Sequence, residues 1–225
     1  MDTIELIKLT MERDLQHLSN VSHNIANVNT SGFLAVDSFE QVLDGRDVVS
    51  KQNVATGKSA INETGRALDF AIQGQGLFSV QLDEKVMLTR NGRFHVDAQG
   101  VIRHHSGAAV LGKNGVITVP DVNFSISSSG VVTHGQDVID ELLLVNVQRV
   151  IPAKEGKTLY VAASAVTGDT HSKVKHSALN AASVNPSHMS IKMLEISRHL
   201  QSMQKAAAAY DQMLNTGISE IGKRN

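Results

Sequence analysis

Both ends of the chain carry apolar residues at alternating spacings of three and four, and this pattern constrains the fold more than any other feature. A seven-residue repeat of this kind places its apolar side chains along one side of a helix and favours packing against a second helix. The N-terminal seam consists of Ile4, Ile7, Met11, Leu18, Val21, Ile25 and Val28, and Asp14 is its one polar position. The C-terminal seam consists of Met189, Met193, Ile196, Leu200, Met203, Ala207, Tyr210, Leu214 and Ile221, interrupted at Gly217. Together these apolar residues are called the assembly seam.

Polar and turn-forming residues set the limits of the two predicted helices. Asn, Thr, Ser and Gly cluster over residues 27–32, where the first helix should end. Asn185 followed by Pro186 is typical of an N-cap and a first helical turn, so the second helix should begin there.

The middle of the chain has a different character. Short apolar runs alternate with turn signals such as Asn91-Gly92 over residues 66–165, which predicts a compact all-β domain. Phe70, Phe78, Phe94 and Phe124 are its expected core. The predicted fold is therefore α+β, with paired terminal α-helices in a coiled-coil core domain and an inserted all-β domain. Its expected parts are a terminal helical assembly domain (1–30 plus 183–225), a linker (31–65), the β domain (66–165) and a return linker (166–182).

The terminal helices also carry apolar residues away from the seam. Leu6 and Leu9 lie off the N-terminal seam, and Ile191, Leu194 and Met213 lie off the C-terminal one. A helix that is apolar on more than one side must be covered on more than one side. Two helices per chain supply one contact, so we expect other copies or partners to supply the rest.

Composition argues against several classes of function. The net charge is -1 and the pI about 6.8, which predicts no nucleic-acid binding. There is no Cys, so thiolate chemistry and Cys-ligated metals are excluded. No apolar stretch of about 18 residues is present, so no direct membrane insertion is expected. The first residues also lack the pattern of a cleaved secretory signal peptide.

Catalytic motifs are equally scarce. His104 and His105 are adjacent, and neighbours in a strand point to opposite faces, so they do not grip one metal. Gly74-Gln75-Gly76 lacks the third glycine of a dinucleotide fingerprint and precedes a strand, which indicates a turn or bulge. We therefore expect no enzyme activity, no cofactor, and no catalytic, cofactor-binding or metal-binding residues.

Five segments resemble one known family. Residues 24–33, NIANVNTSGF, look like the N-terminal signature of flagellar rod and hook proteins. Residues 68–78 and the TRNG run at 89–92 resemble the opening strand and hairpin of that family's β domain. Residues 183–185 and 210–214 resemble its C-terminal helix. The positions that match the terminal signatures are Asn24, Ala26, Asn27, Thr30, Gly32, Phe33, Val184 and Asn185.

The resemblance implies a structural subunit of the bacterial flagellum. In that family the terminal helices pair, copies stack into a helical tube, and the β domain faces outward. Such subunits leave the cell through the flagellar type III export apparatus without a cleaved signal peptide and reside in the basal body, in the periplasmic rod. Their partners are further copies and neighbouring rod subunits. Phe39 and Leu43 fit the family's export-gate motif, and packing of linker residues on a helix explains them equally well.

The sequence leaves two alternatives open, one for the position of the subunit in the flagellum and one for its class of function. The short region at 45–65 favours a proximal-rod subunit that adjoins the distal rod, and a distal-rod or hook-type axial subunit is the alternative within the family. A dimeric binding module, in which a coiled coil tethers a β domain that grips a ligand, is the alternative from a different class. A closed dimer in dilute solution distinguishes this module from an open-ended polymer.

Overall fold

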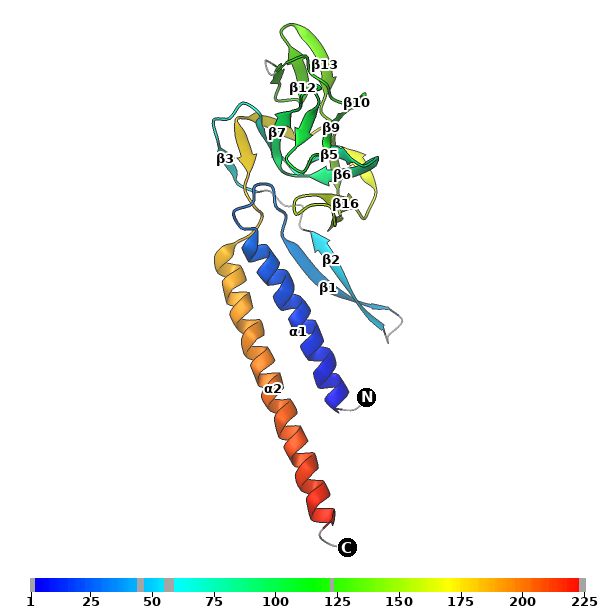
Figure 1. Ribbon diagram of the computed structural model, residues 1–225, viewed down its shortest axis with the longest axis vertical. Coiled ribbons are helices and arrows are strands. Elements are labelled where there is room, and N and C mark those ends of the chain that lie inside the picture. Colours follow the sequence, from blue (N-terminus) through cyan, green and yellow to red (C-terminus); the bar gives the residue numbers. More distant parts are fainter. Residues whose placement is uncertain (1–2, 44–46, 55–58, 122–123, 223–225) are drawn as a thin grey trace. The chain divides into compact units, whose positions relative to one another are not determined.

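The chain divides into two compact units. The structure is a computed structural model that describes residues 3–43, 47–54, 59–121 and 124–222 (Figure 1). One unit, Met1–Ala26 with Asn185–Asn225, contains both ends of the chain, and Asn27–Val184 forms the other. The first is helical and the second is built of strands, which confirms the predicted α+β class.

The helical unit consists of α1 (Thr3–Ala26) and α2 (Pro186–Gly222). The chain turns immediately after α1, where Thr30 N–H donates to the Asn27 carbonyl at 2.9 Å. At the start of α2, the Asn185 side-chain oxygen accepts the His188 N–H at 3.2 Å, and its carbonyl accepts the Met189 N–H at 3.0 Å. Asn185 is therefore the N-cap that the sequence predicts, with Pro186 as first helical residue.

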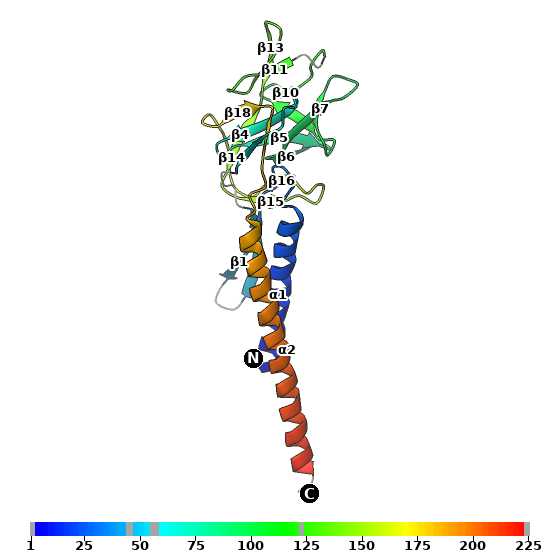
Figure 2. The same cartoon turned by 90° about the vertical axis from the view of Figure 1, so that its left-hand side faces the viewer.

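The two helices contact each other in antiparallel orientation. Asn24 lies against Met189, and Asp14, ten residues earlier on α1, contacts His199, ten residues later on α2. Figures 1 and 2 show the helices side by side along α1, with α2 the longer of the two. Their lengths are 24 and 37 residues, so α2 continues beyond the described start of α1.

The strand unit is organised around one large antiparallel sheet. Its longest path runs in the order β15-β16-β6-β5-β9-β8-β7-β4-β18, with β14 paired to both β5 and β17, and β10 paired to β9. Its strands are β4 (Asp69–Gln73), β5 (Leu77–Leu82), β6 (Lys85–Thr89), β7 (Gly92–Val96), β8 (Ile102–His104), β9 (Ala109–Gly112), β10 (Gly115–Val116), β14 (Leu144–Val147), β15 (Val150–Pro152), β16 (Tyr160–Ala162), β17 (Val166–Gly168) and β18 (Lys173–His176).

Three smaller antiparallel sheets belong to the same unit. The first is the hairpin of β1 (Val36–Leu43) and β2 (Asp47–Val54), and the second joins β3 (Ile61–Glu63) to β19 (Ala178–Asn180). The third contains β11 (Phe124–Ile126), β12 (Val131–His134) and β13 (Asp137–Glu141).

Two apolar clusters hold the strand unit together. The larger contains the buried side chains of Phe70, Phe78 and Phe94, with Phe124 partly buried at its edge. The smaller contains Phe33 and other residues from both ends of the unit, among them Leu34, Val36, Leu77, Leu88 and Tyr160. Neighbouring residues of β5 and β6 enter different clusters, because successive side chains of a strand point to opposite faces. The central strands are therefore covered on both sides.

The structure differs from the predicted linkers. Residues 31–65 contain β1, β2 and β3, and residues 166–182 contain β17, β18 and β19. Strand β18 pairs with β4 along Lys173–His176, and β19 pairs with β3. Strands β3, β17, β18 and β19 are three or four residues long, too short to show an alternating pattern in the sequence. Their position depends on backbone pairing and on a few buried apolar residues such as Val174 and Leu179.

Candidate assembly site

The assembly seam forms the contact between the two helices. The contacts of Asn24 with Met189 and of Asp14 with His199 set the antiparallel register of the two helices. The seam residues of α1 from Ile7 to Ile25 and those of α2 from Met189 to Tyr210 are partly or fully buried. Val28 lies after the end of α1, in the turn that follows it.

Burial along this seam is graded. Val21 and Leu200 are buried, and most other seam residues are partly buried. Ile4 and Leu214 are exposed at the end of the helical unit where α1 begins, and the side chain of Ile221 lies outside those that the structure describes. The off-seam residues Leu6, Leu9, Leu15, Ile191, Leu194 and Met213 are 49–61% exposed. The helix pair therefore leaves a substantial apolar surface uncovered.

A second group of predicted residues lies at the N-terminal edge of the strand unit. Thr30, Gly32 and Phe33 form a turn that lies directly on the backbone of Arg90 and Asn91. Gly32 has a φ of +67°, and a Cβ there would overlap the backbone N and Cα of Asn91. Phe33 is buried in the smaller apolar cluster. The two family motifs that contain these residues, at 24–33 and 89–92, thus meet in space.

Buried hydrogen bonds fix the two segments that lead toward the helices. Gly32 N–H donates to the Asn180 carbonyl at 2.7 Å, and Ser183 N–H donates to the Phe33 carbonyl at 2.8 Å. The Asn180 side chain is fully buried and bonds both the N–H and the carbonyl of Ile72, at 2.8 and 3.0 Å. The Tyr160 hydroxyl accepts the Leu34 N–H at 2.8 Å, and burial raises the pKa of this hydroxyl well above its usual value.

Arg90 supplies the buried charge of this region. Its guanidinium donates to the carbonyls of Ile72 at 3.1 Å and Gly74 at 2.5 Å, and also to that of Gly76. Burial lowers its pKa to about 10, and the nearby carboxylate of Asp169 opposes this change. Asp169 in turn bonds Ser172 Oγ, which accepts the Gly76 N–H at 3.0 Å. Arg90 therefore holds the 72–76 loop in place, and Gly74-Gln75-Gly76 is a turn, as predicted.

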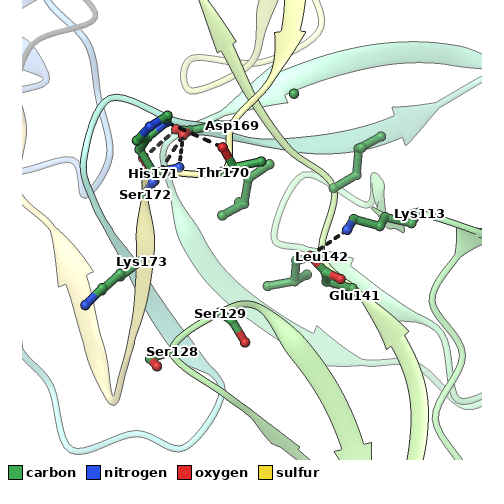
Figure 3. Close-up of a pocket in the computed structure, with 13 residues that line it drawn as sticks. Lys113, Ser128, Ser129, Glu141, Leu142, Asp169, Thr170, His171, Ser172 and Lys173 are labelled. Carbon is green, nitrogen blue, oxygen red and sulfur yellow. Dashed lines mark hydrogen bonds and ion pairs between the residues drawn. The ribbon is translucent and has the colours of Figure 1, made fainter.

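A cleft of the strand unit is lined by charged side chains that are held by hydrogen bonds and an ion pair. This cleft, of about 330 Å³, has the Asp169–Ser172 loop on one side and the Lys113–Glu141 ion pair on the other (Figure 3). Asp169 is engaged by Ser172 Oγ and by the N–H groups of His171 and Ser172, so its carboxylate is a structural acceptor. Across the part of the chain that the structure describes, no group of three or more His, Cys, Asp or Glu side chains is placed to hold a metal ion.

Comparison with known proteins shows which family the chain resembles. The family model of the flagellar hook protein FlgE/F/G D1 domain matches residues 71–134, which span β4 to β12. The predicted resemblance to the flagellar rod and hook family is thus confirmed.

The individual relatives that the chain resembles are flagellar rod proteins. The chain is 28% identical to the flagellar basal-body rod protein FlgF of Caulobacter vibrioides, over 97% of this chain and 96% of that protein. It is 35% identical to FlgF of Rhizobium meliloti, over 51% and 52% of the two chains. It is 33% identical to the rod protein FlgG of Bacillus subtilis, over 52% and 54%. The chain is therefore similar to FlgF rod proteins along nearly its whole length, which supports a structural subunit of the basal-body rod.

The sequence did not indicate several residues of this site. Asn180, Tyr160 and Ser183 act through hydrogen bonds to backbone groups far away in the sequence, and such contacts leave no periodic signal. The contact of His199 with Asp14 was also missed. Its one signal was the polar residue in an otherwise apolar seam, which requires a partner on the facing helix.

Among the described helices, none is long and apolar enough to cross a membrane.

Proposed function

We propose that this protein is a subunit of the flagellar rod that polymerises through its terminal helices, which pair as a coiled-coil core and pack against the helices of neighbouring subunits. The observation that carries the proposal is the exposed apolar surface of the helix pair. Leu6, Leu9, Ile191 and Leu194 remain about half exposed or more although α1 and α2 contact each other. Exposed apolar patches on a protein mark interaction sites.

The arrangement of this surface favours an open polymer over a closed dimer. Leu6 and Leu9 lie near the start of α1, whereas Ile191 and Leu194 lie near the start of α2. Because the helices are antiparallel, these pairs lie toward opposite ends of the helical unit. Contacts between two different patches are heterologous, and repeating them produces rings or helical filaments. A helical tube needs contacts of this type.

Two finer assignments complete the proposal. The chain occupies the proximal rod next to the distal rod, and this position is supported by its similarity to FlgF over nearly its whole length. It reaches the periplasm through the flagellar type III export apparatus, with Phe39 and Leu43 as the export motif. Both residues lie in β1, opposite Lys51 and Asp47 of β2. Both residues are therefore in an extended segment.

Deletion of the gene tests the function. Cells without the protein should lack filaments while hook subunits are still synthesised, because the rod would stop before the hook is built. Basal bodies purified from wild-type cells should contain the protein. Normal filaments in the deletion strain, or a stable dimer in dilute solution that never enters basal bodies, would contradict the proposal and favour the binding module instead.

A further inference from the structure

Asp14 is a buried carboxylate in an otherwise apolar seam. It retains 7% of its accessible surface, and the N-terminal seam residues on either side, Met11 and Leu18, are apolar. Its carboxylate contacts Nδ1 of His199 on α2, and Arg13 Nε lies 4.0 Å from the same carboxylate. His199 lies one residue before the seam residue Leu200, so it reaches Asp14 from the edge of the seam.

A carboxylate in this position is tolerated only while its partner is present. Burying a charged group without a hydrogen-bonding partner is costly, and removal of one member of a buried pair is far more destabilising than replacement of both. Polar residues at single seam positions are known to fix which helices pair, at some cost in stability. The Asp14–His199 contact should therefore favour the pairing of α1 with α2 over other helix pairs.

Pairing between two copies of α1 through this seam does not bring His199 to Asp14. The seam position opposite Asp14 is then either an apolar residue or a second Asp14. The first case removes the His199 contact of the carboxylate, and the second brings two like charges together. The contact of α1 with α2 places a histidine there.

The alternative registers of α1 on α2 are also disfavoured. A shift of one heptad toward the end of α2 replaces His199 by Ala206, which has no side-chain donor. A shift in the other direction replaces it by Lys192, but it then sets Ile25 opposite residues that precede Pro186 and the start of α2. The observed register is the one that satisfies both the carboxylate and the apolar seam.

Within one chain the two helices are kept close together by the segments that connect them to the strand unit. The segments that lead to them are joined inside the strand unit by the Gly32–Asn180 and Phe33–Ser183 backbone hydrogen bonds. Between copies no such connection exists, and in a polymerising protein the apolar helices of many copies meet. A residue pair that favours α1–α2 contacts over α1–α1 contacts would therefore matter for contacts between copies.

We propose that Asp14 and His199 form a partner-selecting pair, which directs the seam of α1 to α2 and prevents seam contact between the α1 helices of two copies. This inference rests on the proposed assembly through terminal helices and adds the residues that control it. The pair acts through the energetic penalty of burying the Asp14 carboxylate without its His199 partner.

Disulfide trapping in the full chain tests this inference, because the protein contains no Cys of its own. A Leu18→Cys chain reports α1–α1 contact by forming disulfide-linked dimers, and an Asn24→Cys/Met189→Cys chain reports the native α1–α2 contact. Adding Asp14→Leu to the first reporter should raise dimer formation at least about tenfold, since it removes the buried charge that opposes the wrong contact. His199→Leu should reduce the native disulfide of the second reporter.

The matched control is Glu12→Leu, which replaces an exposed acidic residue off the seam by the same side chain. It should leave dimer formation at the parental level. The double variant Asp14→Leu/His199→Leu should regain the native disulfide while still forming α1–α1 dimers. Equal dimer formation in the Asp14→Leu and Glu12→Leu chains, with the native disulfide intact, would overturn the inference and leave the proposed function standing. Loss of the native disulfide in the parental reporter would overturn both.

Discussion

Gly32 connects the N-terminal signature to the strand unit. Its left-handed backbone, with φ of +67°, and the overlap of a Cβ with the Asn91 backbone both require a residue without a side chain. The family signature includes Gly32, but the sequence did not indicate which residues Gly32 contacts. That contact depends on the fold of residues 89–92, more than fifty positions away in the sequence.

Gly32→Ala should destabilise the strand unit. The substitution adds backbone strain and forces apart two segments that cannot shift cheaply, so we expect a loss of about 2–4 kcal/mol in the free energy of unfolding. Gly65→Ala is the matched control, because Gly65 has φ of +70° and nothing within 4 Å of an added Cβ. Urea unfolding followed by circular dichroism compares the two. Equal losses would mean that the close approach to Asn91 contributes nothing.

His104 is a buried histidine whose sequence context indicated no special environment. It is fully buried beside Phe94, and its Nδ1 lies 2.8 Å from Ser106 Oγ and accepts the Ser106 N–H at 3.3 Å. The ring proton of the neutral form therefore lies on Nε2, which has no partner among the described residues. Burial, together with the charges of His105 and His95, lowers the pKa of His104 to about 3. The folded protein keeps this ring neutral.

The stability of the strand unit should therefore fall at mildly acidic pH. Because the unfolded chain binds a proton at about pH 6.5 and the folded chain does not, stability is complete above that value and declines as the pH falls toward 3. Between pH 7 and pH 5 we expect a loss of about 1–2 kcal/mol from this residue. His104→Gln should reduce the pH dependence in urea unfolding, whereas His171→Gln at an exposed position should not. An unchanged pH slope in the His104→Gln variant would contradict this assignment.

At the scale of elements, regular patterns were predicted and irregular contacts were not. The 3-4 spacing and the capping residues predicted both helices to within a few residues, and β5 lies within the predicted β domain. Phe70, Phe78 and Phe94 form the expected core. Strands β18 and β19 escaped prediction because short polar strands are stabilised by pairing with β4 and β3, which local sequence does not encode.

The folding unit therefore extends beyond the predicted β domain. A fragment of residues 66–165 lacks Phe33, Leu34 and Val36 of the smaller apolar cluster, as well as Asn180 beside Ile72. Each lost large apolar side chain removes about 1.5–3 kcal/mol of burial. A fragment of residues 27–184 should melt cooperatively in calorimetry, and the 66–165 fragment should melt at lower temperature or without cooperativity. Equal melting temperatures would show that the flanking strands add no stability.

At the scale of the whole molecule, the two units differ in how much apolar surface they bury. The strand unit has two buried apolar clusters, whereas the helical unit exposes leucine and isoleucine on both helices. We therefore expect substitutions in the seam to abolish assembly while they leave the strand unit intact. Leu200 is the sharpest position for this test, because it is 8% exposed and faces α1 next to the Asp14–His199 contact.

The amount of this protein in purified basal bodies, measured by quantitative mass spectrometry, tests the central claim most directly. Cells would express the wild-type chain, Leu200→Asp, or Gln201→Asp, which places the same charge on the neighbouring exposed residue. The account predicts that Leu200→Asp is missing from basal bodies, since an unpaired charge in a helix contact is heavily penalised, although its strand unit melts normally. Gln201→Asp should be present at the wild-type level. Incorporation of Leu200→Asp at the wild-type level would contradict assembly through the terminal helices.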